Sequence, residues 1–297
     1  MMDVSVIIVN YNTKELTKNC IDSVFAKTSG VTFEVILVDN ASTDGSVELF
    51  EKDKRIRFIE SGGNLGFGKA NNLGYQHAAG KYLFLLNSDT LLLNNAIQEF
   101  FLQMEQRDEP IACMGCLLVD ANCQSIHSYG NFMTLRNEMI RKPLFYLHKY
   151  FSVKEGFDDN PLRQIDDHCF EVEYVTGADI FMPKSVADRL GLFDPDFFMY
   201  YEESEMQYRY RKNGYINVIV DTPQVQHLIG GSEKSSRSLW KRSDLPSMML
   251  CCRKLYGSRR ASCLKWLMVA AYTPLAILDV RYPLRERWAF LSKLSKL

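Results

Sequence analysis

The clearest structural signal in the chain is the segment Gly80-Lys81-Tyr82-Leu83-Phe84-Leu85-Leu86-Asn87-Ser88-Asp89. Its five consecutive apolar residues are too few for a typical helix and do not alternate with polar residues, so they predict a strand buried on both faces of a parallel sheet. Ligands of open α/β sheets bind just outside the carboxyl ends of the strands. Asp89 beside Asn87 is suited to hold a divalent cation through oxygen. The alternative is that these polar residues only turn the chain and cap a helix over residues 91–104.

The length and the distribution of charge indicate one large domain with an appendage. The chain has 297 residues, of which 46% are hydrophobic, and a formal net charge of -1. Residues 241–297 contain twelve Lys or Arg and three acids, which gives +9, so the first 240 residues carry -10. We therefore divide the chain into residues 1–240 and a basic region, residues 241–297. The basic region predicts an anionic partner, and we expect a membrane surface rather than nucleic acid.

The eight cysteines lack the spacing of a disulfide framework, and the N-terminus lacks the basic start of a signal peptide. We therefore expect a reducing, cytoplasmic location. Cys113 and Cys116 have the spacing of a metal or redox pair, but they lie in an apolar run that is typical of a strand. Because no second Cys-x-x-Cys pair occurs, we expect these two thiols to be structural.

Strands and helices alternate along the first part of the chain. Further strands are predicted at residues 4–11, 33–39, 55–59, 111–119 and 216–220. Their connections are too long for hairpins, which implies right-handed β–α–β units and a parallel sheet. Asp39, the glycines at 62, 63, 66 and 68, and Asp89 should then lie near one edge of the sheet. The glycine cluster does not follow the first strand, which disfavours a nicotinamide cofactor, and no Walker A sequence occurs.

A second group of acids follows the aromatic run of residues 197–201. Glu202, Glu203 and Glu205 crowd the start of a predicted helix, where they either serve a reaction or simply stabilise the positive end of the helix dipole. Residues 131–151 are interpreted as an amphipathic helix, either over a cleft or on the surface of the sheet. His227 precedes a Gly/Ser-rich loop, and a lone histidine is more often structural than a ligand.

Several segments occur in a recognisable order. They are Val4-Ser-Val-Ile-Ile-Val-Asn-Tyr-Asn12, Val38-Asp-Asn-Ala-Ser-Thr-Asp-Gly-Ser46, Gly63-Asn-Leu-Gly-Phe-Gly-Lys-Ala-Asn-Asn72, Leu85-Leu-Asn-Ser-Asp89, Val175-Thr-Gly-Ala178 and Phe193-Asp-Pro-Asp-Phe-Phe-Met-Tyr-Tyr-Glu-Glu203. Together they cover about residues 4–240 and resemble family-2 glycosyltransferases, in particular the rhamnosyltransferase-like branch that builds bacterial surface polysaccharides.

The resemblance implies a GT-A fold, which is α/β with a Rossmann-like, mostly parallel central sheet flanked by helices, here with a C-terminal helical appendage. It implies inverting transfer of a sugar from a nucleotide-diphosphate donor, with Mg²⁺ or Mn²⁺, to a hydroxyl of a glycan or a polyprenyl-diphosphate-linked acceptor. Rhamnose is the first candidate for the sugar, and another hexose the next.

The resemblance also assigns roles to single residues. Asp39 would bind the pyrimidine base, Asp89 the metal, and Glu203 would be the catalytic base. His227 matches a histidine that in some relatives reaches the metal or the diphosphate. The other donor-binding residues are expected at Asn10, Asn64, Gly66, Lys69 and Asn87, and acceptor-side residues at Gly177, Asp179 and Glu205.

The sequence departs from the family pattern at three positions. Asn87 stands where many members have Asp, so metal binding should depend more on the donor diphosphate, as is usual for Mg²⁺. Glu203 is one methylene longer than the usual Asp, and Glu205 likewise replaces an acid that shapes the site. These changes leave the base open between Glu203 and Glu202.

We interpret the basic region, residues 241–297, as a separate module. Its uninterrupted apolar run, residues 266–278, is thirteen residues long, short of the roughly twenty that span a bilayer. We predict an interfacial anchor on anionic lipid at the inner face of the cell membrane, and the alternative is a helical hairpin packed on the first domain. A nucleotidyltransferase, a glycoside hydrolase with paired carboxylates and a catalytically inactive sugar-nucleotide-binding protein remain as alternative functions.

Overall fold

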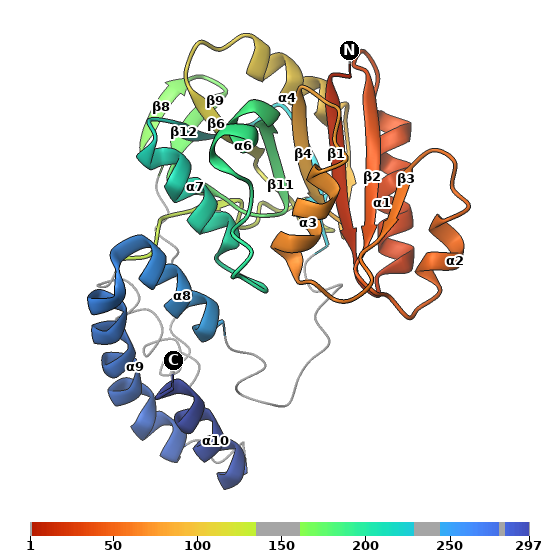
Figure 1. Ribbon diagram of the computed structural model, residues 1–297. Helices are drawn as coiled ribbons and strands as arrows, with labels where there is room; N and C mark the ends of the chain where they lie inside the picture. Colours follow the sequence, from red (N-terminus) through yellow and green to blue (C-terminus); the bar gives the residue numbers. More distant parts are fainter. Residues whose placement is uncertain (1, 135–160, 229–243, 279–282, 297) are drawn as a thin grey trace. The chain divides into compact units, whose positions relative to one another are not determined.

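The computed structural model describes residues 2–134, 161–228, 244–278 and 283–296 (Figure 1). The chain forms two compact units. Unit 1 comprises Met1–Asn131 with Asp159–Glu233, and unit 2 comprises Phe132–Asp158 with Lys234–Leu297. The domain boundary at residue 240 stays a prediction. Most of the predicted amphipathic helix at residues 131–151, and most of the Gly/Ser-rich loop after His227, lie outside the described residues.

Unit 1 is built around a nine-stranded sheet with the order β3-β2-β1-β4-β11-β6-β12-β9-β8. Its strands are β1 (Val4–Asn10), β2 (Phe33–Asp39), β3 (Arg57–Glu60), β4 (Tyr82–Asn87), β6 (Ile111–Cys116), β8 (Arg163–Asp166), β9 (Cys169–Val172), β11 (Asp179–Pro183) and β12 (Ile216–Val220). Among these strands, β11 and β9 run antiparallel to the rest. The predicted mostly parallel sheet is therefore confirmed.

Two short sheets complete the strands of the described chain. One pairs β5 (Thr90–Leu92) with β13 (Val225–His227), and the other pairs β7 (Tyr129–Gly130) with β10 (Tyr174–Val175). Both connect segments that are far apart in the sequence.

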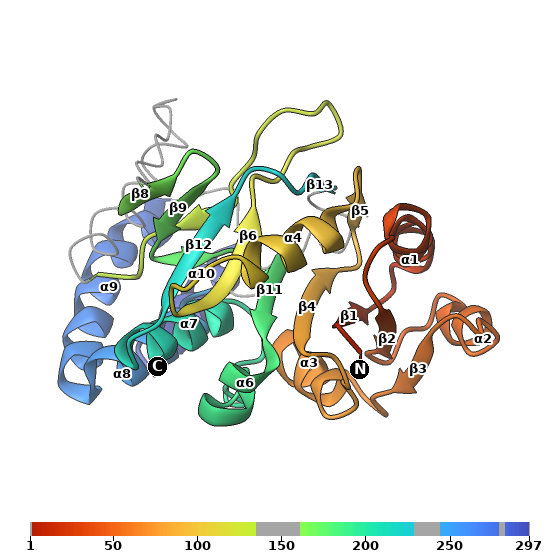
Figure 2. The same ribbon diagram turned by 90° about the horizontal axis from the view of Figure 1, so that it is seen from above.

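Helices cover both faces of the large sheet (Figure 2). The helices of unit 1 are α1 (Lys14–Lys27), α2 (Ser46–Phe50), α3 (Phe67–Tyr75), α4 (Ala96–Glu105), α6 (Lys184–Leu190) and α7 (Glu202–Lys212). Helices α1 and α4 pack on one face, and α3, α6 and α7 pack on the other. This layering confirms the predicted α/β class.

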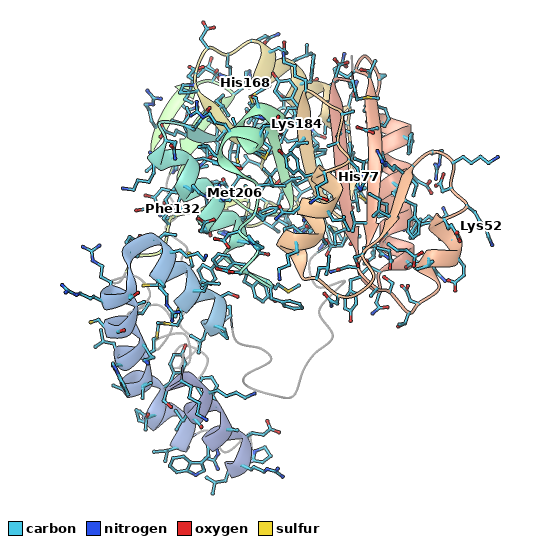
Figure 3. The ribbon with its side chains drawn as sticks, in the orientation of Figure 1. Lys52, His77, Phe132, His168, Lys184 and Met206 are labelled. Carbon is cyan, nitrogen blue, oxygen red and sulfur yellow. The ribbon has the colours of Figure 1, made fainter. Side chains whose placement is uncertain are left out.

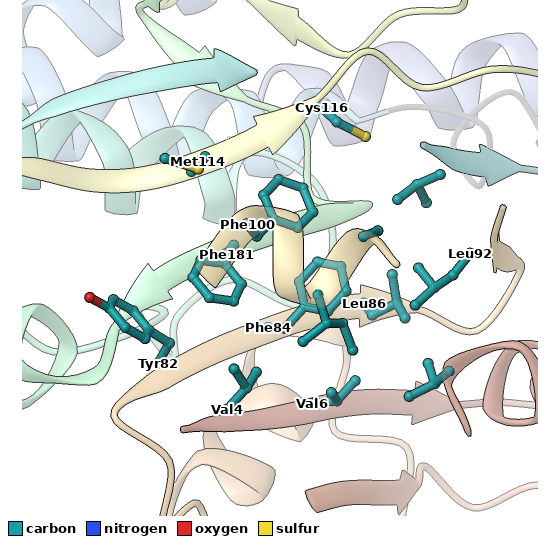
Figure 4. Close-up of a cluster of buried hydrophobic side chains, with 14 of the residues drawn as sticks. Val4, Val6, Tyr82, Phe84, Leu86, Leu92, Phe100, Met114, Cys116 and Phe181 are labelled. Carbon is teal, nitrogen blue, oxygen red and sulfur yellow. The ribbon is translucent and has the colours of Figure 1, made fainter. Parts of the chain in front are cut away.

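The alternation of side chains along the central strands explains why both faces need a cover. Val6 and Ile8 of β1 pack with α1 and α4, whereas Ile7 between them packs on the opposite face. On the first face, the rings of Phe100 and Phe181 stack at a centroid distance of 5.4 Å (Figure 4). On the second face, Met206 of α7 is completely buried (Figure 3).

The helix predicted at residues 91–104 begins later than expected, at Ala96. Residues Thr90–Leu92 form β5 instead, which pairs antiparallel with β13 in the register Leu92↔Val225. Leu92 is buried in the core. A distant strand thus decides the conformation of a segment whose local pattern favours a helix.

Cys113 and Cys116 lie in the interior strand β6, and both are buried free thiols. Burial raises the pKa of each thiol well above its usual range. This burial supports the structural role that the sequence predicts for them.

Unit 2 contains three helices among its described residues: α8 (Leu245–Tyr256), α9 (Ser258–Leu278) and α10 (Leu284–Leu294). Helix α9 packs against both others. The ring of Tyr272 on α9 contacts that of Phe290 on α10 at 5.7 Å between centroids. None of the helices that the structure describes combines the length and the hydropathy needed to cross a membrane.

Candidate functional site

The parallel strands β1, β2 and β4 end side by side at one edge of the sheet. Asn10 lies opposite Asp39, and Val9 lies opposite Asn87. Polar residues that are far apart in the sequence therefore meet at this edge, which is where open α/β sheets bind their ligands. The structure brings together the predicted residues Asn10, Asp39 and Asn87.

Asn10 is fully buried at the centre of a hydrogen-bond network. Its Nδ2 donates to Oδ2 of Asp39 at 2.7 Å and to Oγ of Ser42 at 3.0 Å. Its Oδ1 accepts from Oγ1 of Thr13 at 2.9 Å and of Thr17 at 2.7 Å. These bonds use both donors and both lone pairs of the amide. The side chain of Asn10 therefore orients Asp39, and direct contact between Asn10 and a donor stays a prediction.

The carboxylate of Asp39 is held from two sides. Its Oδ2 accepts from Asn10, and its Oδ1 accepts from the backbone N–H of Ser42 at 2.8 Å. Asp39 is 1% exposed. Each carboxylate oxygen retains a second lone pair, and the contact of Asp39 with a donor base stays a prediction.

Asn40 is a candidate site residue that the sequence analysis did not single out. Its Oδ1 accepts from the backbone N–H of Leu65 at 2.9 Å, and its Nδ2 donates to Oδ1 of Asn64 at 3.1 Å. The same Asn64 oxygen accepts from the N–H of Gly66 at 3.0 Å. Asn40 thus fastens the glycine-rich segment to the end of β2. The available signal was an amide directly after Asp39 at a strand end.

Gly66 allows two segments of the site to approach closely. Its φ is 84°, and a Cβ at this position would lie 2.1 Å from the carbonyl oxygen of Phe198. The N–H of Phe67 donates to that same oxygen at 3.0 Å. The glycine-rich segment is therefore joined to the aromatic segment of residues 197–201. Lys69, predicted to bind the donor, is exposed on α3.

Strands β5 and β13 place Asp89 beside His227. Thr90 pairs with His227 in the register, and the N–H of Leu228 donates to the carbonyl of Asp89 at 2.8 Å. Oδ1 of Asp89 then lies 3.2 Å from Nε2 of His227. The structure thus brings together the two residues that the resemblance implies as metal ligands.

These two side chains fit a cation that is shared with a diphosphate. Mg²⁺ is commonly held by one or two carboxylates together with substrate phosphates and water. Within the described residues, no group of three or more His, Cys, Asp and Glu side chains is placed to hold a metal ion. The role of Asp89 and His227 as metal ligands stays a prediction.

Helix α7 begins directly after two strained residues. Tyr200 and Tyr201 have positive φ values of 71° and 68°, and such conformations cost roughly 1–3 kcal/mol each. Further along the helix, Gln207 holds β10 by two hydrogen bonds to Val175. Its Oε1 accepts from the N–H of Val175 and its Nε2 donates to the carbonyl of Val175, each at 2.7 Å. The turn and these two hydrogen bonds fix the position of Glu202 at the start of the helix.

Glu202 and Glu203 have different surroundings. A Cβ on Gly68 of α3 would lie 3.7 Å from Cβ of Glu202, and one on Gly177 would lie 3.9 Å from Cγ of Glu203. Glu202 is 2% exposed, and burial followed by the charge of Glu203 raises its pKa to about 8. Glu203 is partly exposed, and burial also raises its pKa. Of the two residues, Glu203 is the more exposed, and the choice of base between them stays a prediction.

Asp179 begins β11 and is fully buried, opposite Leu86 of β4. Its Oδ2 accepts from the N–H of Cys116 at 2.8 Å, whereas its Oδ1 has no hydrogen-bond partner. Burial raises the pKa of Asp179 to about 7, and the nearby His227 opposes this shift. Asp179 is thus within electrostatic reach of His227, and its acceptor-side role stays a prediction.

Glu205 forms an ion pair with Arg209, with Oε2 of the acid 3.2 Å from the guanidinium. Arg209 also donates to the carbonyls of Leu190, Gly191 and Leu192. These hydrogen bonds fasten α7 to the end of α6 and to the residues that follow it. The described contacts of Glu205 are therefore structural, and its predicted place on the acceptor side is untested.

With this geometry established, comparison with known proteins decides the family. A family model for glycosyl transferase family 2 matches residues 5–167, more than half of the chain. The chain belongs to glycosyl transferase family 2. The match includes the ends of β1, β2 and β4 with Asn10, Asp39 and Asp89, and the rhamnosyltransferase-like branch stays a prediction.

Three curated relatives illustrate the likeness. The low-salt glycan biosynthesis hexosyltransferase Agl10 of Haloferax volcanii is 27% identical over 73% of this chain and 64% of its own. The glycosyltransferase GlyG of Streptococcus pneumoniae is 30% identical over 36% of this chain and 37% of its own. The succinoglycan biosynthesis protein ExoO of Rhizobium meliloti is 27% identical over 48% and 41%. The chain thus spans less than two thirds of the length of these relatives.

Solved structures agree on the architecture. GalNAc-T7 with UDP, GalNAc and Mn²⁺ has a TM-score of 0.59 at 18% identity, over 80% of this chain and 46% of that protein. S. aureus TarS 1-349 has a TM-score of 0.56 at 14% identity, over 97% and 78%. At these identities the likeness shows the fold alone, and it confirms the GT-A fold expected from the sequence.

Proposed function

We propose that this family-2 protein transfers a sugar, with inversion, from a nucleotide-diphosphate donor to a hydroxyl of a glycan or lipid-linked acceptor. The observation that carries the proposal is the separation of two kinds of group. Asp89 and His227 lie 3.2 Å apart at the junction after β4, whereas the partly exposed Glu203 stands on a separate element, at the start of α7. An in-line displacement needs one group on the leaving diphosphate and another on the attacking hydroxyl.

The donor side follows from the sheet edge. Asp39, held by Asn10 and Ser42, offers fixed lone pairs to the N–H groups of a base. The glycine-rich segment, fastened by Asn40, supplies backbone at the same edge. A divalent cation at Asp89, Mg²⁺ or Mn²⁺, would supply charge stabilisation to the leaving diphosphate. One structural neighbour that was crystallised with UDP, GalNAc and Mn²⁺ supports this assignment.

The acceptor side needs a base, because a sugar hydroxyl is a poor nucleophile. Glu203 accepts the hydroxyl proton, and its raised pKa brings it closer to neutral pH, where a general base works best. Burial and the charge of Glu203 raise the pKa of the neighbouring Glu202 to about 8, which disfavours Glu202 for this role. General-base catalysis contributes roughly 10²–10⁴ in rate.

The finer identity of the substrates rests on similarity alone. The relative named as a low-salt glycan biosynthesis hexosyltransferase supports hexose transfer, and the relative named for succinoglycan biosynthesis supports a role in glycan synthesis. We keep rhamnose as the first candidate, a polyprenyl-diphosphate-linked glycan as the acceptor, and the cytoplasmic face of the cell membrane as the location.

Calorimetric titration with nucleoside diphosphates, with and without Mg²⁺ or Mn²⁺, tests the donor side. We expect binding that needs the cation, prefers one base and is lost in Asp89→Ala. Asp53→Ala is a matched control, because Asp53 lies away from this edge and pairs with Arg55. Absence of nucleotide binding with either cation would contradict the proposal and favour a glycoside hydrolase.

Turnover of a labelled donor tests the acceptor side. Glu203→Gln should leave nucleotide binding intact and lower turnover by roughly a hundredfold or more. Unchanged turnover would remove Glu203 from the mechanism. A wild-type protein that binds donors and turns none over with any acceptor would be a binding protein.

A further inference from the structure

Helix α9 of unit 2 is apolar on two opposite sides. One side is buried and comprises Ala261, Leu264, Met268 and Tyr272. The other side is exposed and comprises Cys263, Trp266, Leu267, Ala270, Pro274 and Ile277. At 3.6 residues per turn, the spacing within each set makes one continuous stripe, and the two stripes lie about half a turn apart. The buried stripe supplies packing for α9, as in the contact of Tyr272 with Phe290, and the exposed stripe is not needed for that packing.

Helix α10 presents a similar exposed surface. Leu284 and Trp288, one turn apart, are 59% and 58% exposed, while Phe290 faces the core. On α9, Trp266 and Ile277 are 59% and 54% exposed. We call these four residues, together with Leu267, the outer stripe. Large exposed apolar surfaces mark an interaction site more often than chance exposure does.

The charge of unit 2 indicates what the outer stripe meets. Unit 2 contains nineteen Lys or Arg and six Asp or Glu, a net charge of +13, so unit 1 carries -14. Cations flank the stripe itself: Nζ of Lys265 lies 5.1 Å from the centre of the Trp266 ring. Arg259 is exposed seven residues before Trp266, on the same side of α9, and the exposed Arg285 adjoins Leu284.

Tryptophan, aliphatic side chains and cations on one helix surface match the interface of an anionic bilayer. Tryptophan prefers the headgroup level, aliphatic side chains reach the acyl boundary, and Lys and Arg meet the lipid phosphates. Phosphate contacts with a nucleic acid would not account for exposed Leu267 and Ile277. Self-association would bring two strongly basic surfaces together.

We propose that the outer stripe of α9 and α10 binds the surface of an anionic lipid bilayer, with the helices in the plane of the interface. This binding site requires no spanning segment. It does not depend on the transfer chemistry of unit 1, so each proposal can fail alone.

Co-sedimentation of the full chain with vesicles tests the proposal. We expect binding to phosphatidylcholine vesicles that contain phosphatidylglycerol and weaker binding to vesicles of phosphatidylcholine alone. At about 1 M salt, the protein should bind both kinds of vesicle equally. Trp266→Ser with Trp288→Ser should lower binding to anionic vesicles at least tenfold. Arg259→Ala with Arg285→Ala should lower it about thirtyfold and leave binding to neutral vesicles unchanged.

Two controls make the test specific. Leu102→Ser removes an exposed leucine of α4 in unit 1 and should change nothing. Thermal unfolding of each variant should match the wild type, because every replaced side chain is at the surface. Nucleotide binding by unit 1 should also be unchanged.

Fluorescence supplies an independent readout, because the chain contains three tryptophans. Replacing Trp240 by phenylalanine leaves Trp266 and Trp288 of the outer stripe as the remaining tryptophans. In this variant, anionic vesicles should shift the tryptophan emission to shorter wavelength. Absence of both the shift and co-sedimentation would overturn the proposal. It would also be overturned if Leu102→Ser lost as much binding as the tryptophan variant. A stripe-dependent dimer, or retention on nucleic acid, without vesicle binding would assign the surface to that partner instead.

Discussion

Replacing Glu202 by glutamine should stabilise unit 1, and the gain should grow with pH. The folded protein raises the pKa of Glu202 from 4.5 to about 8. Below pH 4.5 both the folded and the unfolded chain hold the proton of Glu202, so this group does not lower the free energy of unfolding. As the pH rises toward 8, the unfolded chain releases the proton while the folded chain keeps it, and the free energy of unfolding falls. Glutamine has no proton to release, so the variant avoids this loss.

The size of the effect follows from the shift. Each pKa unit corresponds to 1.36 kcal/mol, and the shift of about 3.5 units sets an upper limit of about 5 kcal/mol at pH 8. The charge of Glu203 causes part of the shift, so we expect a gain of about 3–5 kcal/mol. The slope should be about 1.4 kcal/mol per pH unit between pH 5 and 7.5. For a unit of this size, the melting temperature should rise by about 10 °C at pH 8.

Thermal and urea unfolding of both proteins at pH 5, 6, 7 and 8 measures the difference. Glu205→Gln is the matched control on the same helix: it removes the ion pair with Arg209 and should destabilise the protein over this whole range. A difference between Glu202→Gln and the wild type that stays constant from pH 5 to 8 would refute the reasoning about a buried proton.

Three further changes test the donor side of the site. Gly66→Ala should destabilise unit 1 by at least about 1 kcal/mol, because its φ is 84° and a Cβ would collide with the carbonyl of Phe198; an unchanged melting temperature would contradict this. Asn40→Ala should release the glycine-rich segment and weaken nucleotide binding roughly tenfold in calorimetry, whereas wild-type affinity would exclude a supporting role. His227→Ala should weaken nucleotide binding roughly tenfold when the cation is present and leave binding without the cation unchanged; an equal loss in both conditions would show a purely structural histidine.

Much of the fold could be predicted because its signals are local. The apolar run that ends at Leu86 is too short for a helix and has no polar side, so it predicts an interior strand wherever the rest of the chain lies. Turn residues after it, such as Asp89, mark where the strand ends. Parallel connection then brings the ends of β1, β2 and β4 to one edge, which is why Asp39 and Asp89 could be placed near one edge.

Other features required the folded chain. Residues 90–92 pair with β13, far along the sequence, and this pairing overrides a local helical pattern. Neither Asp89 nor His227 indicates its partner by spacing.

The sequence by itself therefore determined the layered α/β fold, the edge of the sheet at which the polar residues gather, and the family motifs. These features depend on strand burial and turn chemistry, which neighbouring residues decide. The tertiary structure alone decided which of two adjacent glutamates is the more exposed, since Glu202 packs against α3 and Glu203 faces Gly177. It also decided the role of Asn40, because its hydrogen bonds reach a segment more than twenty residues away. Accessibility and pairing depend on elements brought together from distant parts of the chain, and no local pattern encodes them.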